Sequence, residues 1–88
     1  MESREVTIKN KSGLHARPAH AFVQAATKFN SKITISKGSR TGSGKSIVNI
    51  IALGLTQGTE IIISAQGEDE KQAVDTLVEL VNSKFGEE

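Results

Sequence analysis

The spacing of apolar residues changes along the chain, and each change predicts an element. From Ala16 onward apolar side chains recur every three or four residues as far as Phe29, which is the spacing of a helix with one buried face. Its apolar positions are Ala19, Phe22, Val23, Ala26 and Phe29. Pro18 fits a first helical turn, because it has no N–H and its φ is already near the helical value. We therefore predict a helix that begins at His15 or Ala16 and ends at Phe29.

Strands are predicted where apolar and polar residues alternate or form a short apolar run. Alternation over 5–9 and 32–36 predicts two strands that each bury one face. The isoleucine-rich run 60–65, bounded by turn residues, predicts a central strand. Glycines weaken the interval 40–45, so we expect an edge strand there that is short, bulged or irregular.

Two further helices are predicted downstream. Ser46 is a suitable N-cap for a short helix over 47–53, which Gly54 would end. The five apolar side chains of this helix allow two interpretations: all belong to the core, or some stay exposed as a docking patch. Asp69, with Gln72 at the third helical position, predicts the start of the last helix. The apolar positions of that helix are Ala73, Val74, Leu77, Val78, Leu80, Val81 and Phe85.

The resulting order is strand, helix, strand, strand, helix, strand, helix, with the last helix ending at 84–86. Strands with one polar side need only one covered face, which predicts an α+β fold: a four-stranded antiparallel sheet with three helices on one face. The 88 residues are expected to form one small domain over 1–88.

Composition narrows the function classes. Eleven basic and ten acidic residues give a net charge of +1, so bulk charge does not predict nucleic-acid binding. The absence of cysteine excludes disulfides and thiol chemistry. No stretch has the length of a signal peptide core or a membrane span. We expect a cytoplasmic protein that binds neither nucleic acid nor membrane and needs no cofactor.

His15 is the candidate reactive residue. The N–H groups and partial positive charge at a helix start favour anions, phosphate above all, and a neutral imidazole is a nucleophile. Arg17 adds a planar fork of donors that matches phosphate oxygens. The alternative, that His15 is a helix-end histidine without special role, stays open on these residues alone. His20 lies about 140° around the helix from His15, so no shared metal site is expected.

The glycine-rich stretch 38–46 is similar in composition to a nucleotide-binding loop. The first glycine of a Walker A loop would have to stand where Ser39 is, whereas Gly38 is one place too early. The interval is therefore interpreted as a hairpin rich in turn residues.

The chain resembles the HPr family, the histidine-containing phosphocarrier proteins of the bacterial phosphoenolpyruvate:sugar phosphotransferase system. The residues that carry the resemblance are Gly13-Leu14-His15-Ala16-Arg17-Pro18-Ala19, Lys45-Ser46-Ile47, Leu53-Gly54, Gly58, Glu60, Ile61 and Gly67. The resemblance covers the whole chain and implies an open-faced β-sandwich. It also implies that His15 is phosphorylated at Nδ1, that Arg17 and the Ala16 and Arg17 backbone hold the phosphate, and that Ser46 is a regulatory phosphorylation site.

The resemblance implies a carrier that is a substrate of phosphotransferases and not itself an enzyme. Its implied partners are Enzyme I as donor, sugar-specific IIA domains as acceptors, an HPr kinase/phosphorylase and a transcriptional regulator in catabolite repression. The docking surface is expected to comprise His20, Gln24, Ile47, Val48 and Ile51. Two interpretations of Lys28 and Lys45 stay open: with Arg17 they surround the phosphorylation surface, or they are only solvated, as isolated exposed lysines more often are.

The chain departs from the family pattern beside Ser46. Val48 and Ile51 stand where methionines are common, and Asn49 stands where glycine is common. Stiff β-branched side chains adapt less well than methionine to several partners, which suggests a narrower partner set. The alternative function is a regulatory HPr-like protein that mainly binds a transcription factor or an enzyme. The presence of His15 argues against it.

Overall fold

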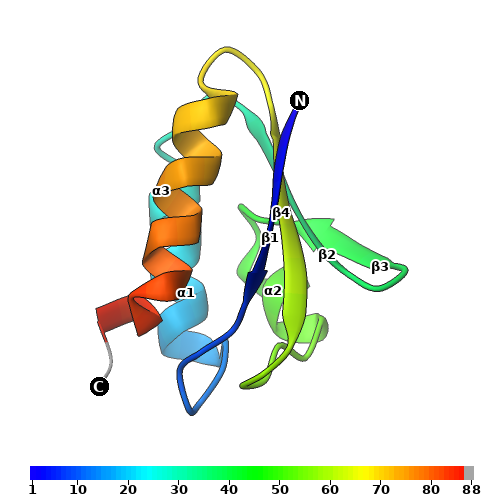
Figure 1. Ribbon diagram of the computed structural model, residues 1–88, viewed down its shortest axis with the longest axis vertical. Helices are drawn as coiled ribbons and strands as arrows, with labels where there is room; N and C mark the ends of the chain where they lie inside the picture. Colours follow the sequence, from blue (N-terminus) through cyan, green and yellow to red (C-terminus); the bar gives the residue numbers. More distant parts are fainter. Residues whose placement is uncertain (87–88) are drawn as a thin grey trace.

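Four strands pair to form one antiparallel sheet in the order β1-β4-β2-β3 (Figure 1). The structure is a computed structural model that describes residues 1–86. The strands are β1 (Glu2–Thr7), β2 (Lys32–Lys37), β3 (Arg40–Ser43) and β4 (Glu60–Gln66). The central pair β2–β4 joins two segments that are far apart in sequence.

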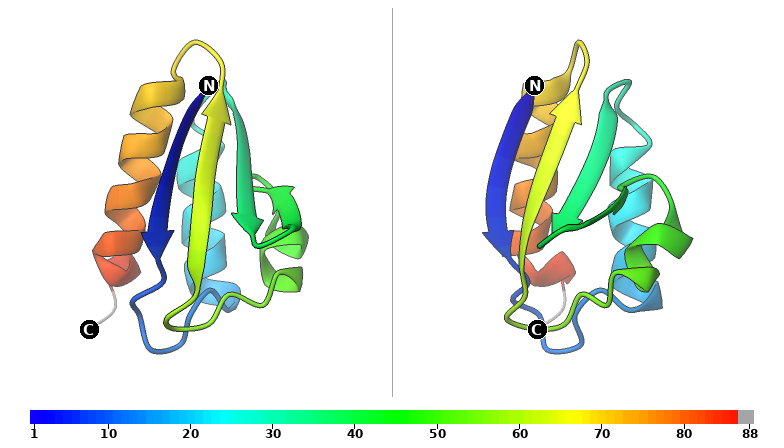
Figure 2. Two further views of the ribbon diagram at one scale, coloured as in Figure 1. Left: turned by 45° about the vertical axis from the view of Figure 1, so that its right-hand side comes forward. Right: turned by 90° about the vertical axis from the view of Figure 1, so that its right-hand side faces the viewer.

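The helices lie on one face of this sheet and leave the other face open (Figure 2). They are α1 (Ala16–Ala26), α2 (Ile47–Ala52) and α3 (Glu70–Asn82), followed by a short 3-10 turn, η1 (Lys84–Gly86). The predicted α+β fold with four strands, three helices and an open-faced sheet is confirmed.

Alternation along the strands separates the two faces of the sheet. Ile61 and Ile63 of β4 and Ile35 of β2 are buried beneath the helices, whereas Ile62 points to the open face and is 42% exposed. Phe22 of α1 is completely buried over this layer, and burying an aromatic side chain of this size contributes about 2–3 kcal/mol. The core therefore fixes α1 against the sheet.

Helix ends differ from the predicted positions. Helix α1 ends at Ala26 instead of Phe29, because the chain tightens there: the N–H groups of Lys28 and Phe29 donate to carbonyls only three residues back. Phe29 nevertheless packs against the core. Helix α3 ends at Asn82, and Phe85, predicted on its inward face, lies half-buried in η1 with a left-handed φ of 58°.

The last helix begins where predicted, but its expected cap does not form. Asp69 occupies the N-cap position, yet its carboxylate accepts hydrogen bonds from the Asn30 and Ser31 N–H groups and from the Ser31 hydroxyl. Glu70, and not Gln72, reaches back to a backbone N–H, that of Gly67, at 3.1 Å. Asp69 thus joins the start of α3 to the loop after α1.

The strands follow the predicted positions with two differences. Strand β1 covers Glu2–Thr7 instead of 5–9, and Ile8 is buried just after it, with its N–H donating to the Thr59 carbonyl at 2.9 Å. Strand β3 is short, as expected, but it pairs with β2 without a bulge from Lys37–Arg40 to Thr34–Ser43.

Candidate functional site

His15 is the N-cap residue of α1 and its side chain is exposed. Its backbone is extended, and its carbonyl accepts the first helical hydrogen bond, from the Ala19 N–H at 2.9 Å. Since the N–H groups of a first turn have no acceptor within the helix, and Pro18 has no N–H, the first-turn donors are those of Ala16 and Arg17. A phosphoryl group on His15 would lie beside these two amides.

The loop that leads to His15 is held in a single shape by contacts with the segment before β4. Gly13 has φ +65°, and a Cβ there would lie 2.3 Å from the Leu55 carbonyl oxygen. The Leu14 N–H donates to that same carbonyl at 2.8 Å, while the Asn10 side-chain amide donates to the Gly13 carbonyl at 2.6 Å. Only glycine fits at position 13, and the close approach fixes where α1 begins.

Arg17 is exposed and lies beside a hollow of about 310 Å³ between the start of α1 and the end of α3. Pro18, Ala21, Phe85 and Gly86 complete the lining. The two helix ends meet here because the helices run in opposite directions, as Figure 1 shows. Arg17 is two residues after His15 in the first turn of α1, with its side chain exposed.

The exposed side of α1 carries the predicted docking residues His20 and Gln24. Their i, i+4 spacing places them on the same side of the helix. Helix α2 packs against α1, so the structure brings the two predicted parts of the docking surface onto neighbouring helices.

Helix α2 settles the alternatives that its apolar sequence left open. Ile50 and Leu53 belong to the core, whereas Val48 is 74% and Ile51 47% exposed. Ile47 is half-buried, so only part of its side chain is accessible to a partner. We call Val48 and Ile51 the α2 patch, an exposed apolar pair of the kind that marks protein contacts.

Ser46 is the N-cap of α2, as predicted. Its Oγ accepts a hydrogen bond from the Asn49 N–H at 3.2 Å, and its own N–H donates to the Ser43 carbonyl at 3.3 Å. The side chain is half-buried. A substituent on Oγ would therefore point out at the start of α2, close to the α2 patch.

The interpretation that Lys28 and Lys45 surround the phosphorylation surface is wrong. The Lys45 ammonium donates to the Phe29 carbonyl at 2.7 Å, just beyond the C-terminal end of α1. Lys28 lies near the same end, and thirteen residues of helix-like chain separate it from His15, about 20 Å. Both lysines are therefore remote from the N-terminal end of α1.

Several residues that shape this surface carried no local signal in the sequence. Leu55 and Thr56 pack against Gly13, Arg40 donates a hydrogen bond to the end of α2, and Asn49 of α2 accepts one from Ser43 of β3. Their partners are distant in sequence or lie on other elements, so neither periodicity nor a motif points to them. They become visible only once the elements are packed.

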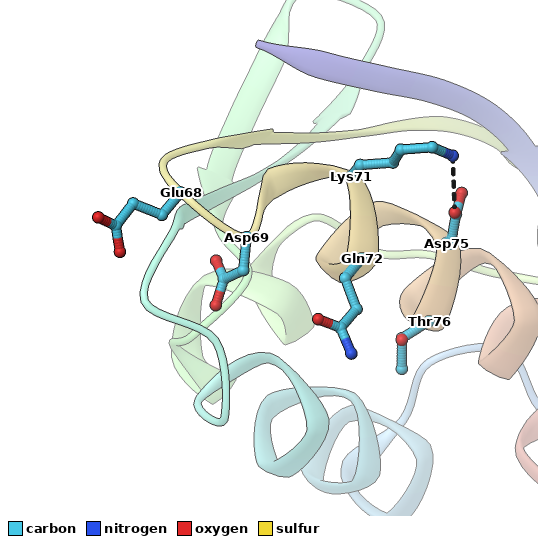
Figure 3. Close-up of a pocket in the computed structure, with 6 residues that line it drawn as sticks. All are labelled: Glu68, Asp69, Lys71, Gln72, Asp75 and Thr76. Carbon is cyan, nitrogen blue, oxygen red and sulfur yellow. Dashed lines mark hydrogen bonds and ion pairs between the residues drawn. The ribbon is translucent and has the colours of Figure 1, made fainter.

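A separate hollow of about 470 Å³ lies along the start of α3 (Figure 3). Glu68, Asp69 and Asp75 are the carboxylates that line it. Asp69 is bonded to the loop after α1, and Asp75 is bonded to Arg4 at 2.6 Å and to Lys71 at 3.2 Å. These bonds lower the pKa of both groups, through the Ser31 hydroxyl first for Asp69 and through Lys71 first for Asp75. The hollow lies at the opposite end of α1 from His15 and holds no reactive group positioned for the same chemistry.

None of the helices in the described part of the chain, residues 1–86, has the length and apolar character needed to cross a membrane.

Comparison with known proteins identifies the class. The family model described as "PTS HPr component phosphorylation site" matches residues 2–83. The phosphocarrier protein HPr of Haemophilus influenzae is 49% identical over 81 residues, which cover 92% of this chain and 95% of that protein. A multiphosphoryl transfer protein of the same organism is 44% identical over 84 residues. The match covers 92% of this chain but only 17% of that protein.

Comparison with solved structures agrees with the sequence relatives. The crystal structure of HPr-C-His from Thermoanaerobacter tengcongensis superposes with a TM-score of 0.97 at 50% identity, covering 100% of this chain and 99% of that one. The chain belongs to the HPr family of the phosphotransferase system. The relatives that it matches over nearly their whole length, in Haemophilus influenzae and Borreliella burgdorferi, are named phosphocarrier proteins.

Proposed function

We propose that the protein carries a phosphoryl group on His15, which it receives from Enzyme I and passes to sugar-specific IIA domains. Phosphoenolpyruvate is the original source. The observation that carries the proposal is the position of His15: an exposed imidazole at the N-cap of α1, directly before the Ala16 and Arg17 N–H groups.

Transfer is a displacement at phosphorus. The Nδ1 lone pair of neutral His15 forms a bond to the phosphorus while the bond to the donor's phosphohistidine breaks, and the electron pair of that bond returns to the donor ring. The transition state is loose and in line, with charge spread over three equatorial oxygens. Amide donors already in place stabilise this charge without rearrangement, and Arg17 adds charge-assisted hydrogen bonds.

Transfer from His15 to an acceptor requires that the protein bind the phosphoryl group with only moderate strength. The phosphoryl group on His15 is exposed, so water competes with the protein donors and a partner can approach in line on the opposite side. An exposed site therefore suits a carrier, which must bind the group in one complex and give it up in the next. Residues 1–88 act as one carrier domain in the cytoplasm in this proposal, without a cofactor.

The α2 patch and the exposed side of α1 form the surface that both donor and acceptors contact. Ser46 lies at its border, and we assign it as a regulatory phosphorylation site for an ATP-dependent HPr kinase/phosphorylase. Phosphoserine adds nearly two negative charges. Beside an apolar patch these charges raise the desolvation cost and repel acidic partners. The modified form would offer a site to a transcriptional regulator instead.

The test is incubation with phosphoenolpyruvate and Enzyme I. The parent should gain one acid-labile phosphoryl group, and His15→Ala should gain none while keeping the parent's circular dichroism spectrum, because the His15 side chain is exposed and contributes little packing. His20→Ala is the matched control and should be labelled. An unlabelled parent would favour the alternative, a regulatory protein that acts by binding, and label on His15→Ala would transfer the role to His20.

A further inference from the structure

Helix α2 is too short to keep its own orientation. It has six residues, Ile47–Ala52, of which only Ile50 is buried, whereas isolated helices below about 12–15 residues are marginal in water. The direction in which the α2 patch faces therefore depends on contacts from neighbouring elements.

The C-terminal end of α2 is held by two cations of the β2–β3 hairpin. The Arg40 guanidinium donates to the Ala52 carbonyl at 2.8 Å, and the Lys37 ammonium donates to the carbonyls of Leu53 and Gly54 at 3.1 and 3.2 Å. The last carbonyls of a helix find no N–H donor within the helix, and positive charge is favourable at this end. Both residues flank the turn of the hairpin, which thus binds the end of α2 on one side.

The middle of α2 is bound to the same hairpin. Asn49 Oδ1 accepts a hydrogen bond from the Ser43 N–H at 2.9 Å, where β3 ends. A Cβ at Gly42 would lie 3.1 Å from the Asn49 Cβ, which is tighter than ordinary van der Waals contact. The glycine therefore leaves the room that lets Asn49 approach β3.

We propose that the β2–β3 hairpin is the positioning element of the docking surface. Arg40 and the Ser43 N–H, from which Asn49 of α2 accepts a hydrogen bond, hold α2 so that Val48 and Ile51 face a protein partner in one orientation. Because an ordered patch loses less conformational freedom on binding, the hairpin sets the affinity of the docking step and leaves the chemistry at His15 unchanged. This inference rests on the proposed function, since it takes the α2 patch as the surface that Enzyme I contacts.

The first test separates docking from chemistry. Arg40→Met keeps the aliphatic stem and removes the donor, and it should raise the apparent KM of Enzyme I for the carrier about three- to tenfold, with kcat unchanged, the range expected for one lost hydrogen bond to a helix end. Arg40→Lys keeps a cationic donor and should restore most of the affinity. Lys71→Met, which removes an exposed cation of α3, is the control and should match the parent.

The second test asks whether Arg40 acts through α2 or touches the partner directly. Gly42→Ala crowds Asn49 and displaces α2 without changing any charge. It should raise KM as Arg40→Met does, and both variants should speed amide hydrogen exchange at Ile51 and Leu53 in the isolated protein. A raised KM for Arg40→Met alone, with parental exchange rates, would overturn the proposal, because Arg40 would then be a direct contact.

The two proposals fail in different ways. An unlabelled parent refutes the proposed function, while the exchange rates, measured without Enzyme I, still decide whether the hairpin orders α2. A labelled parent with parental KM and exchange rates in both Arg40→Met and Gly42→Ala refutes the positioning role alone. Thermal unfolding of each variant excludes global unfolding as the cause of a raised KM.

Discussion

Arg17 and the first-turn amides of α1 differ in how they can hold a phosphoryl group. The amides of Ala16 and Arg17 are fixed by the helix, and the loop before them is fixed by Gly13 against Leu55. The Arg17 side chain is exposed and can move. In the proposed function, the amides therefore set the position of the phosphate, and the guanidinium adds charge and hydrogen bonds when the phosphoryl group is transferred.

Arg17→Lys should slow phosphoryl transfer about tenfold, because the charge remains but the two-pronged donor is lost. Single-turnover kinetics with phosphorylated Enzyme I measure the effect. Arg4→Lys makes the same exchange at an arginine that pairs with Asp75 and should leave transfer unchanged. A parental rate in Arg17→Lys would reduce Arg17 to a solvated charge.

Ser46 allows a second comparison at this scale. Ser46→Asp mimics part of the phosphoserine charge and should raise the donor's KM several-fold, because a carboxylate beside the α2 patch resists desolvation. Ser46→Ala loses the cap of α2, which contributes about 1 kcal/mol to stability, but adds no charge. Steady-state kinetics decide between them: equal Michaelis constants would leave Ser46 as a helix cap without a regulatory role.

At the scale of elements, α1 and α2 divide the work. Helix α1 is anchored through Phe22 and carries His15 at its start, whereas α2 has one buried residue and carries an exposed apolar pair. An element with little burial tolerates substitution on its outer side, so in the proposed function docking can be changed on α2 without disturbing the site on α1.

Val48→Asp should weaken binding of Enzyme I at least about tenfold, because it places a charge in a contact that excludes water. The fold should persist, since Val48 is 74% exposed. Titration calorimetry measures the affinity. Ile62→Asp, the same change at an exposed residue on the open face of the sheet, is the control; equal affinity in both variants would remove the α2 patch from the docking surface.

At the scale of the whole molecule, Asp69 links the start of α3 to the loop after α1. Three hydrogen bonds to residues 30 and 31, the one from the Ser31 hydroxyl first, lower its pKa below the ordinary value of 3.8. Because the folded-state pKa lies below the unfolded one, this stabilisation is fully present above pH 3.8 and is lost as the pH falls through the folded-state pKa. The ionised carboxylate thus joins two helices that the sequence separates.

Asp69→Asn should therefore lower the thermal unfolding midpoint at pH 7, and the difference from the parent should shrink as the pH falls below 3.8. Calorimetric scans between pH 7 and pH 2 check this. Glu68→Gln, a change at the exposed neighbouring carboxylate, should leave the midpoint nearly parental. A difference for Asp69→Asn that is independent of pH would mean that shape, and not ionisation, carries the contact.

Local features of the chain determined the type and order of the elements and the position of His15 at the start of α1. Apolar spacing and Pro18 predict the start of α1 at His15 because a helix start depends on a few neighbouring residues. The alternation in β2 and β4 predicts which side chains are buried. For the same reason Ser46 could be identified as a cap before any contact was known.

The tertiary structure alone decided what holds these parts in place. Strand order, the closure of Leu55 behind Gly13, the turning of Asp69 away from its own helix and the attachment of α2 to the hairpin are contacts between elements. The residues that form each contact come close together only when the elements pack. Which contact forms depends on the space that glycines leave and on the area that is buried. The local sequence pattern does not contain those distances. It therefore indicates His15 as the candidate reactive residue, but it does not predict the contacts that hold α2 against the hairpin.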